Sequence, residues 1–408
     1  MRTARARLGD IARVFNGNSI SVADKDKHFR GANGTPYIGT AEVGFDAEIT
    51  FASGVTIPDD KLQPFRRARA GTALVCAEGG SAGRKVGFLD RDVCFGNKLF
   101  ALEPAEGWDG KFLFYFAQSA AFRKQFRSLT TGLIGGVSIK KFKEIEVPSF
   151  PVEEQRRIVA VLDEVFAALA TATFNAEKNL ANARELFKSL LESRFDDARS
   201  RAQTCPLEQL CVANRVITYG VIKLGEHVPD GVPCLRTSNV RWLGFELDEV
   251  KRIQTTLSEE YGRTILSGGE VLVNVRGTLG GVAVVDSSMI GWNVSREVAV
   301  VPCDESKVDP QYLAFWIGTR CSQDWLAYVE KGVAYTGINI SDLRSLPVVH
   351  LPLEEQRRIV AELASSLSMT RAVEASFERK LENLAKLKQS FLRRAFSGEL
   401  TTRELLAA

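Results

Sequence analysis

The sequence lacks the residue patterns that metal sites, disulfide frameworks and common catalytic sites require. Its three histidines, His28, His227 and His350, are dispersed, and none stands in an H-x-x-x-H pair or beside a candidate nucleophile. The seven cysteines include no C-x-x-C pair, so we expect free thiols in a reducing cytoplasm. We therefore expect neither a metal site nor a catalytic residue in this chain.

Long apolar runs are also absent. We find no run of about 18 apolar residues, and no apolar segment follows the basic first ten residues, so no membrane span and no secretory signal are expected. The chain has 408 residues, of which 45% are hydrophobic and 25% charged. These values are typical of soluble globular protein, and the length predicts two or more domains.

Motifs for nucleotide binding, DNA cleavage and methyl transfer fail on spacing. The segment GGSAGRK (79–85) is not a phosphate loop, because Lys85 precedes Val86 instead of Ser or Thr. A PD…E-x-K nuclease motif fails because Gly80 stands where its lysine should follow Glu78. No Gly-rich fingerprint opens a βαβ unit, as a methyltransferase would need. These absences favour a binding protein over an enzyme.

The strongest signal that is present is an internal repeat of about 200 residues. PVEEQRRIVA (151–160) recurs as PLEEQRRIVA (352–361), and the offset continues without a gap to Phe195 and Phe396. Upstream segments pair at slightly drifting offsets: TPYIGTAEV (35–43) with VPCLRTSNV (232–240), and GTALVCAEG (71–79) with GEVLVNVRG (269–277). The order of the elements is therefore the same in both halves.

Each repeat ends in a segment with helical apolar spacing. Pro151 and Pro352 precede a Glu-Glu pair and mark the helix starts, and each helix should run for roughly 43 residues. A narrow apolar stripe on so long a helix favours a partner helix, and antiparallel pairing of the two would give a pseudo-twofold arrangement. The alternative is that each stripe packs on its own domain.

The residues expected at the helix interface, or at a partner interface on the helices, share the apolar stripe. They are Ile158, Leu162, Val165, Leu169, Ala172, Ala176, Ile359, Leu363, Val373 and Phe377. We expect the small Ala172 and Ala176 to face the bulky Val373 and Phe377, because complementary sizes fill a shared interface.

The remaining segments predict an α+β fold. Short β-like runs broken by glycine occupy 72–77, 85–90, 270–275 and 281–286, and amphipathic helical patterns occupy 110–127 and 310–328. We therefore expect two mixed globular domains, at 1–150 and 205–351. One long helix should lie within each of the segments 151–204 and 352–408.

Charge alone does not assign a ligand to the two domains. Residues 1–150 carry 22 lysines and arginines against 16 acidic residues, whereas residues 205–351 carry 13 against 17. Net charge therefore suits a phosphate-binding surface only in the first domain. Gly-rich loops at 79–85 and 276–281 stand at matching places, where a simple hairpin turn is as good an interpretation as a loop that reaches a ligand.

One known family matches these features. The repeated G-[VI]-x-I-x-x-[FL] and P-x-E-E-Q-R-R-I-V-A patterns, followed by a long helix, resemble the specificity (S) subunit of type I restriction-modification systems over essentially the whole chain. The resemblance implies two target-recognition domains, each reading half of a split DNA sequence. The two repeated helices would pair as an antiparallel coiled coil and set the gap between the halves.

The resemblance also implies partners in a bacterial defence complex. Methyltransferase (M) subunits would dock against the helices, and restriction (R) subunits would translocate and cleave double-stranded DNA. S-adenosylmethionine would belong to M, and ATP with Mg²⁺ to R, so no cofactor is expected on this chain. The helix-start residues Glu153 to Arg157 and 354–358 are interpreted as first-turn acids and as contacts to the recognition domain or to M, not as catalytic groups.

Seven cations are the candidates for DNA contact, namely Arg84, Lys85, Lys98, Lys140, Lys141, Arg276 and Arg296. A solvated surface charge is the alternative interpretation for each. Because the two recognition domains differ in sequence, we expect an asymmetric target. The competing functions are a pure interaction scaffold and a stand-alone nuclease or methylase. A neighbouring gene for an N-P-P-[FY] methylase would argue against both.

Overall fold

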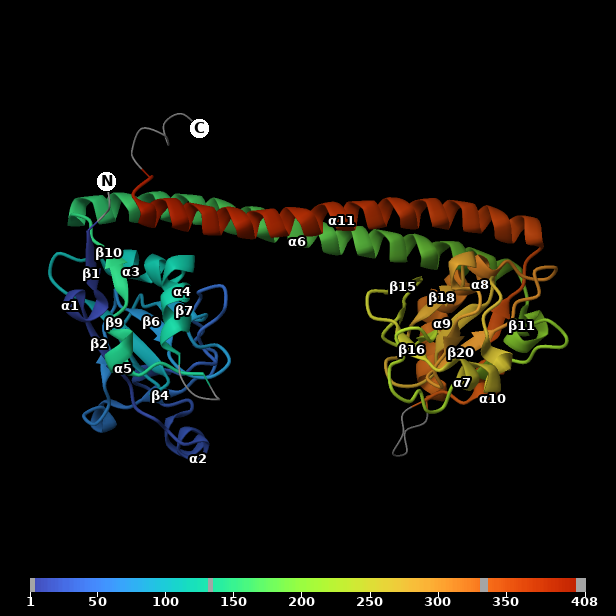
Figure 1. Cartoon of the computed structure of the whole chain (residues 1–408), viewed down its shortest axis with the longest axis horizontal. Helices are drawn as coiled ribbons and strands as arrows, with labels where there is room; N and C mark the ends of the chain where they lie inside the picture. The colour runs from blue at the N-terminus through green and yellow to red at the C-terminus, as the bar shows by residue number, and fades with distance from the viewer. Residues whose placement is uncertain (1–3, 131–134, 331–336, 401–408) are drawn as a thin grey trace. The chain divides into compact units, whose positions relative to one another are not determined.

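The computed structural model describes residues 4–130, 135–330 and 337–400 (Figure 1). The chain forms two compact units. Unit 1 comprises Met1–Glu177 together with Arg379–Ala408, and unit 2 comprises Lys178–Glu378. Each unit therefore combines a globular domain with part of both long helices.

The two long helices are α6, Val152–Arg201, and α11, Leu353–Ser397. Pro151 and Pro352 stand immediately before them, as predicted, and each first turn holds two glutamates, which the positive end of the helix dipole favours. Both helices are somewhat longer than predicted, with 50 and 45 residues.

The helices pack antiparallel within each unit. In unit 2, Arg184 pairs with Glu374 at 2.9 Å and Arg194 pairs with Glu362 at 2.5 Å, so residue numbers rise along one helix as they fall along the other. In unit 1 the ammonium of Lys388 on α11 lies 5.0 Å from the ring centre of Phe166 on α6. The predicted antiparallel pairing is confirmed in both units.

Unit 1 is built on two four-stranded sheets, in the orders β2-β9-β6-β7 and β4-β3-β8-β5, with a separate β1-β10 pair. Its strands are β1 Arg5–Arg7, β2 Ala12–Asn16, β3 Thr35–Ile38, β4 Thr56–Ile57, β5 Arg67–Ala68, β6 Ala73–Cys76, β7 Val86–Phe88, β8 Val93–Phe95, β9 Leu99–Pro104 and β10 Glu146–Pro148. Its helices besides α6 and α11 are α1 Leu8–Ile11, α2 Val22–Asp24, the π-helical η1 Lys25–Phe29, the 3-10 helix η2 Asp59–Lys61, α3 Gly110–Ala117, α4 Ala120–Leu129 and α5 Ile139–Phe142.

Unit 2 repeats this plan with sheets β12-β20-β17-β18 and β16-β13-β19, and the pairs β14-β15 and β11-β21. Its strands are β11 Thr204–Pro206, β12 Thr218–Tyr219, β13 Val232–Leu235, β14 Val240–Arg241, β15 Gly244–Phe245, β16 Lys251–Ile253, β17 Val271–Asn274, β18 Val282–Val284, β19 Asn293–Val294, β20 Val298–Val301 and β21 Pro347–Val349. Its helices are α7 Thr255–Glu260, α8 Pro310–Gly318, α9 Arg320–Val329, α10 Ile340–Arg344 and the 3-10 turns η3 Leu207–Leu210, η4 Gly262–Thr264 and η5 Ser287–Met289. The internal repeat therefore extends to the order of strands in the main sheet.

The predicted helices at 110–127 and 310–328 are each two helices in the structure. Ser119 and Thr319 begin the second helix of each pair with their hydroxyls as caps, accepting hydrogen bonds from the amides of Phe122 (3.1 Å) and Ser322 (3.4 Å). A capping hydroxyl at this position starts a new helix and allows the chain to change direction, so the predicted helical segments are confirmed, with one break in each that the pattern did not predict.

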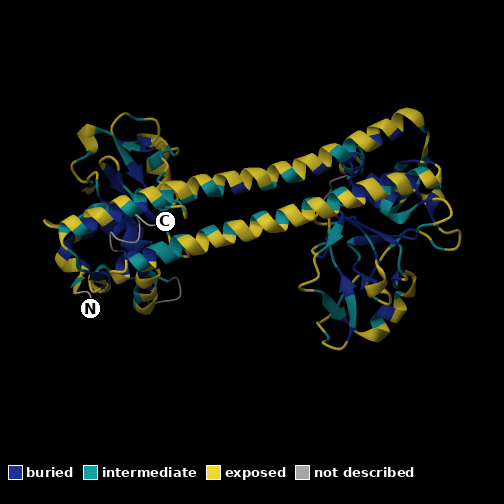
Figure 2. Cartoon of the chain, turned by 90° about the horizontal axis from the view of Figure 1, so that it is seen from above, coloured by how far each residue is buried: buried dark blue, intermediate teal, exposed yellow. Residues whose placement is uncertain are grey.

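The end of one long helix and the start of the other complete the core of each unit. In unit 1, Phe396 of α11 packs on Phe112 and Phe116 of α3, with ring centres 5.2 and 5.3 Å apart. In Figure 1, α3 and α4 lie next to α6, and in Figure 2 the buried residues of the helices are concentrated where they meet the globular domains. The helix stripes therefore pack both on each other and on a domain.

Unit 2 has the same arrangement at the equivalent residues. Phe195 of α6 packs on Tyr312 and Trp316 of α8, at ring-centre distances of 5.2 and 5.5 Å. Phe195 and Phe396 are related by the repeat, so each unit takes its closing phenylalanine from the helix that ends in it.

A buried glutamine in each helix start fixes the globular domain to the helix. The side-chain oxygen of Gln155 accepts from the backbone amide of Asp109 (2.9 Å), and its side-chain NH₂ donates to the carbonyls of Gly107 (3.3 Å) and Phe150 (2.9 Å). Gln356 makes the equivalent contacts with Asp309, Lys307 and Leu351. Both side chains are fully buried, so the glutamine of the EEQRR segment contacts the globular domain.

Among the helices in the described ranges, α6 passes a composition test for a membrane span. It contains an 18-residue stretch of mean hydropathy 1.5, of which 17% is buried. Such a helix is weak support for a membrane span, because helices that pack on soluble cores pass the same test. Inside α6, Asp163 accepts hydrogen bonds from Tyr115 and from Lys111 (2.6 Å), which ties this part of the helix to the globular domain.

A lysine replaces an apolar side chain at one matched position of the helix pair. Phe187 is buried in unit 2, whereas its repeat partner in unit 1 is Lys388. Burial lowers the pKa of Lys388, and the charge of Arg123 acts in the same direction, against a smaller opposing effect of Asp46. The charged form is therefore disfavoured in the folded protein.

The lowered pKa of Lys388 predicts that the stability of unit 1 depends on pH. The pKa of Lys388 is lower in the folded state than its ordinary value of about 10.4 in the unfolded state. At pH values between these two pKa values, the unfolded state binds more protons than the folded state. The stability of the wild-type protein should therefore rise with pH across this window. Lys388→Met should therefore stabilise unit 1 at pH 7, and its advantage should shrink towards pH 10. Denaturant unfolding at the two pH values measures this. Lys386→Met, at an exposed position, should show no such trend, and an advantage of Lys388→Met that grows with pH would refute the argument.

Candidate nucleic-acid interface

The Gly-rich loops are the connections of two matching hairpins. β6 pairs antiparallel with β7, and β17 pairs antiparallel with β18, so the hairpin interpretation is confirmed for both loops. Each loop begins at a residue that bridges to a glycine far along the chain, Glu78 to Gly136 and Arg276 to Gly337. The two loops therefore start from equivalent backbone positions.

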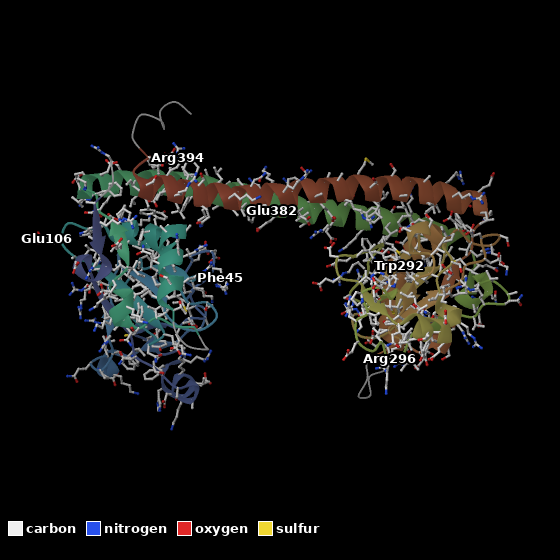
Figure 3. The ribbon with its side chains drawn as sticks, in the orientation of Figure 1. Phe45, Glu106, Trp292, Arg296, Glu382 and Arg394 are labelled. Carbon is white, nitrogen blue, oxygen red and sulfur yellow. The ribbon has the colours of Figure 1, made fainter. Side chains whose placement is uncertain are left out.

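Arg84 and Lys85 are brought together on one aromatic ring. The guanidinium of Arg84 lies 5.2 Å and the ammonium of Lys85 lies 5.1 Å from the ring centre of Phe45, which is 64% exposed (Figure 3). Arg84 also donates to the carbonyl of Gly80 (2.6 Å), and Lys85 donates to that of Thr40 (3.0 Å). These contacts order the loop, and a DNA contact by either cation stays a prediction.

Arg276 and Arg296 lie on neighbouring segments of unit 2. The guanidinium of Arg276 is 5.7 Å from the ring centre of Tyr219, and the backbone amide of Arg296 donates to the carbonyl of Val221 (2.9 Å). Figure 3 shows Arg296 at the end of unit 2 that is farthest from the helices. The two cations thus belong to one set of loops.

The other three candidate cations, in unit 1, are exposed. Lys98 lies in the turn between β8 and β9. Lys140 and Lys141 lie on the short helix α5, which the buried Phe142 anchors against Phe100 at a ring-centre distance of 4.9 Å. The structure therefore does not gather all seven predicted cations into one cluster, and their DNA contacts stay predictions.

The predicted helix-interface residues differ in burial. Ile158 and Leu162 are buried in the core of unit 1, and Ile359 and Leu363 are buried in that of unit 2. Ala176 is also buried, while Val165, Leu169, Ala172 and Phe377 are half-buried and Val373 is 41% exposed. The expected contact of Ala172 and Ala176 with Val373 and Phe377 would join residues of different units and stays a prediction.

The cysteines form no disulfide and no metal-ligating group within the described residues. All seven cysteines are free thiols, and burial raises the pKa of Cys94 to about 11 and those of Cys211 and Cys234 to about 12, so these thiols are protonated at neutral pH. Within the parts of the chain that the structure describes, no three His, Cys, Asp or Glu side chains are grouped so as to hold a metal ion.

Comparison with known proteins indicates one family. Residues 4–179 match the type I restriction modification DNA specificity domain. The chain is 27% identical over 195 residues to the EcoBI specificity subunit of Escherichia coli, a match that covers 48% of this chain and 41% of that relative. It is 22% identical to the EcoKI specificity subunit of Escherichia coli strain K12 over 77% of this chain and 70% of that one. Residues 4–179 therefore carry a domain of this family, and the family model and the relatives together indicate a specificity subunit. The EcoBI match spans less than half the length of that relative.

Solved structures show that this chain shares the fold of proteins of type I restriction-modification systems. A chain in a study of complex assembly and conformational transition of the type I restriction-modification system matches with a TM-score of 0.70 at 17% identity, covering 98% of both chains. The HsdS subunit of Thermoanaerobacter tengcongensis matches with a TM-score of 0.52 at 18% identity over 97% of both chains. The fold is thus α+β, with two globular domains and a repeated pair of antiparallel helices, and specificity subunits of type I systems are not catalytic.

The helix-start residues were predicted to contact the recognition domain or M, but the sequence did not single out the residue that contacts the domain. Gln155 and Gln356 were grouped with the charged helix-start residues, yet only the glutamines are fully buried between helix and domain. Glu78 was not among the candidate residues, although the pairing of 71–79 with 269–277 places it opposite Arg276 and it precedes the Gly-rich loop of unit 1.

Proposed function

We propose that this chain reads a split, asymmetric DNA target within a type I restriction-modification complex. The globular domains, residues 1–150 and 205–351, each read one half of the target. The observation that carries the proposal is the combination of one backbone plan with two different sets of loop side chains, because sequence is read by side chains that reach base edges. Two different sets of side chains on matching loops would read two different half-sites.

The helix segments 151–204 and 352–408 hold the recognition domains and dock the M subunits. Several exposed apolar side chains on the helices are available for docking, and contiguous apolar surface is what a partner interface needs. These side chains are Phe174, Leu186, Met369, Val373 and Leu387. In unit 1, Phe166, Leu169, Phe174 and Leu384 also line a groove along the helix pair.

Chemistry in this complex belongs to the partner subunits. M subunits with S-adenosylmethionine methylate adenine at the recognised site, and R subunits with ATP and Mg²⁺ restrict unmodified DNA. The specificity subunit supplies sequence choice alone and works on double-stranded DNA in the bacterial cytoplasm. Lys140 and Lys141, exposed at the start of α5, suit contacts to the phosphate backbone, which position a protein without reading sequence.

Methylome sequencing tests the proposed function. The host is compared with a strain that lacks this gene and with a strain in which the gene is restored, while the cognate M subunit is expressed in all three. We expect adenine methylation at one motif with two different halves and a fixed gap, present only when this gene is present. Formation of a stable complex with M but no methylation at any bipartite site would contradict the proposal and favour the scaffold alternative.

A further inference from the structure

Glu78 and Arg276 occupy equivalent places at the mouths of the two Gly-rich loops. The residue before each one, Ala77 or Val275, accepts a backbone hydrogen bond from the strand-like segment after its bridging glycine, at 3.2 and 2.7 Å respectively. A carboxylate in unit 1 therefore stands where unit 2 carries a guanidinium. The duplication kept the backbone and inverted the charge.

A second pair of matched positions lies in the turn that enters the next strand. The amide of Leu99 donates to the carbonyl of Gly96 (3.1 Å), and the amide of Val298 donates to that of Ser295 (3.0 Å), which closes the same turn in each unit. The central residues are Asn97 and Lys98 in unit 1 and Arg296 and Glu297 in unit 2. Each of the two positions differs between the units in which hydrogen bonds its side chain can donate or accept.

Backbone hydrogen bonds join each turn to its loop mouth. The amide of Ala77 donates to the carbonyl of Lys98 (2.9 Å), and the amide of Val275 donates to that of Glu297 (2.9 Å). The loop-mouth residue and the two turn residues therefore form one three-position set in each unit. Figure 3 shows Arg296, a member of the unit 2 set, on the end of the unit away from the helices.

The unit 1 set is exposed, whereas Arg276, Arg296 and Glu297 of the unit 2 set are half-buried. Glu297 accepts a hydrogen bond from the hydroxyl of Ser295 (2.9 Å). In unit 1, no ion pair links Glu78 to Lys98 in the ranges that the structure describes. Next to Glu78, a Cβ built on Gly79 would meet nothing within 4 Å, and at the matching Gly277 it would meet only an oxygen at 3.9 Å. The backbone beside each set is therefore open to the approach of a large ligand.

We propose that these three matched positions are the specificity-determining positions of the two recognition domains. The unit 1 set is Glu78, Asn97 and Lys98, and the unit 2 set is Arg276, Arg296 and Glu297. This inference rests on the proposed function and adds to it the residues that distinguish the half-sites. The positions differ in charge or donor character within a matched backbone, as half-site discrimination requires.

The chemistry of each set gives its base preference. Arginine pairs with the O6 and N7 of guanine, asparagine with the N6 and N7 of adenine, and glutamate accepts from the N4 amine of cytosine. Unit 2, with two arginines, reads a half-site that contains guanine. Unit 1 replaces one of these arginines by Asn97 and the other by Glu78, so adenine and cytosine take their places.

Methylation of a randomised duplex library by the assembled M–S complex tests this assignment. Arg276→Gln should lower discrimination at one base pair of one half-site by about 5- to 150-fold, the range that a good bidentate contact supplies. The other half-site and the gap should stay unchanged. Arg320→Gln, at an 84% exposed arginine elsewhere in unit 2, is the matched control and should leave the whole motif intact.

A set exchange tests unit 1 independently. The triple variant Glu78→Arg, Asn97→Arg and Lys98→Glu should change only the half-site that Arg276→Gln leaves unchanged, and should add guanine to it. If a variant does not methylate DNA, its base preference is measured by competition binding with duplexes that differ in one base pair. The single variant Asn97→Arg provides a milder change. Unaltered base preferences in variants that fold and bind would overturn the inference while the proposed function stands. A wild-type complex that selects no bipartite motif would count against the proposed function itself.

Discussion

Replacing Phe396 with alanine is expected to lower the free energy of unfolding of unit 1 by about 3 to 5 kcal/mol. The ring is 7% exposed and packs edge-on against Phe112 and Phe116. Its removal therefore loses buried apolar surface and two aromatic contacts, and it leaves a cavity in the core. Amide hydrogen exchange measures the effect unit by unit, with β6 and β9 reporting on unit 1 and β17 and β20 on unit 2.

The internal repeat supplies the matched experiment. Phe195→Ala should destabilise unit 2 by a similar amount, because Phe195 packs on Tyr312 and Trp316 in the equivalent way. Phe174→Ala, at a side chain 63% exposed, is the control and should change stability by less than about 0.5 kcal/mol. If Phe396→Ala lowered the exchange protection of β17 and β20 and left β6 and β9 unaffected, the ring would belong to the core of unit 2 and the assignment to unit 1 would be wrong.

Gln155→Leu is expected to cost about 3 kcal/mol, although leucine is apolar and similar in size. The change removes the acceptor for the amide of Asp109 and the donors for the carbonyls of Gly107 and Phe150, and a buried polar group without a partner costs about 1 to 3 kcal/mol. Asp109 also caps α3 by accepting hydrogen bonds from the amides of Lys111 and Phe112. Loss of the hydrogen bond that holds Asp109 should therefore also destabilise the start of α3.

Denaturant unfolding with the same exchange readout measures the loss. Gln356→Leu should reproduce the cost in unit 2, where the equivalent hydrogen bonds run to Asp309, Lys307 and Leu351. Gln63→Leu, at an exposed glutamine of unit 1, serves as the control. A cost below about 1 kcal/mol for both buried glutamines would mean that water replaces their side chains without penalty.

The helices and hairpins were predictable because their signals are local or repeated. Pro151 and Pro352 followed by acids mark helix starts, and the Gly-rich segment after 72–77 lies between two short apolar runs, as in a hairpin. The repeat itself predicted that both halves share one architecture. Antiparallel pairing followed from the need of each long stripe for a partner.

Most of the remaining features depend on contacts between residues far apart in sequence. The caps at Ser119 and Thr319 are local, with hydrogen bonds to amides three residues on, but Ser and Thr also occur inside helices and on surfaces, so these residues alone did not mark a helix start. The contacts of Arg84 and Lys85 with Phe45 need a loop about 40 residues away, so sequence alone assigned these cations to DNA and not to the loop that they order. Val373 fitted the helical stripe, yet its exposure is set by how the helices turn against each other.

The way in which the units are assembled from the chain bears on how the protein is made. Unit 2 is one continuous stretch, Lys178–Glu378, whereas unit 1 needs Arg379–Ala408 to complete its core around Phe396. At about 5 to 20 residues per second, a ribosome takes roughly 10 to 40 seconds to synthesise the intervening stretch. During that time the nascent first domain exposes Phe112 and Phe116, so the first half to emerge is the last to finish folding, and it has the greater need of chaperones during synthesis.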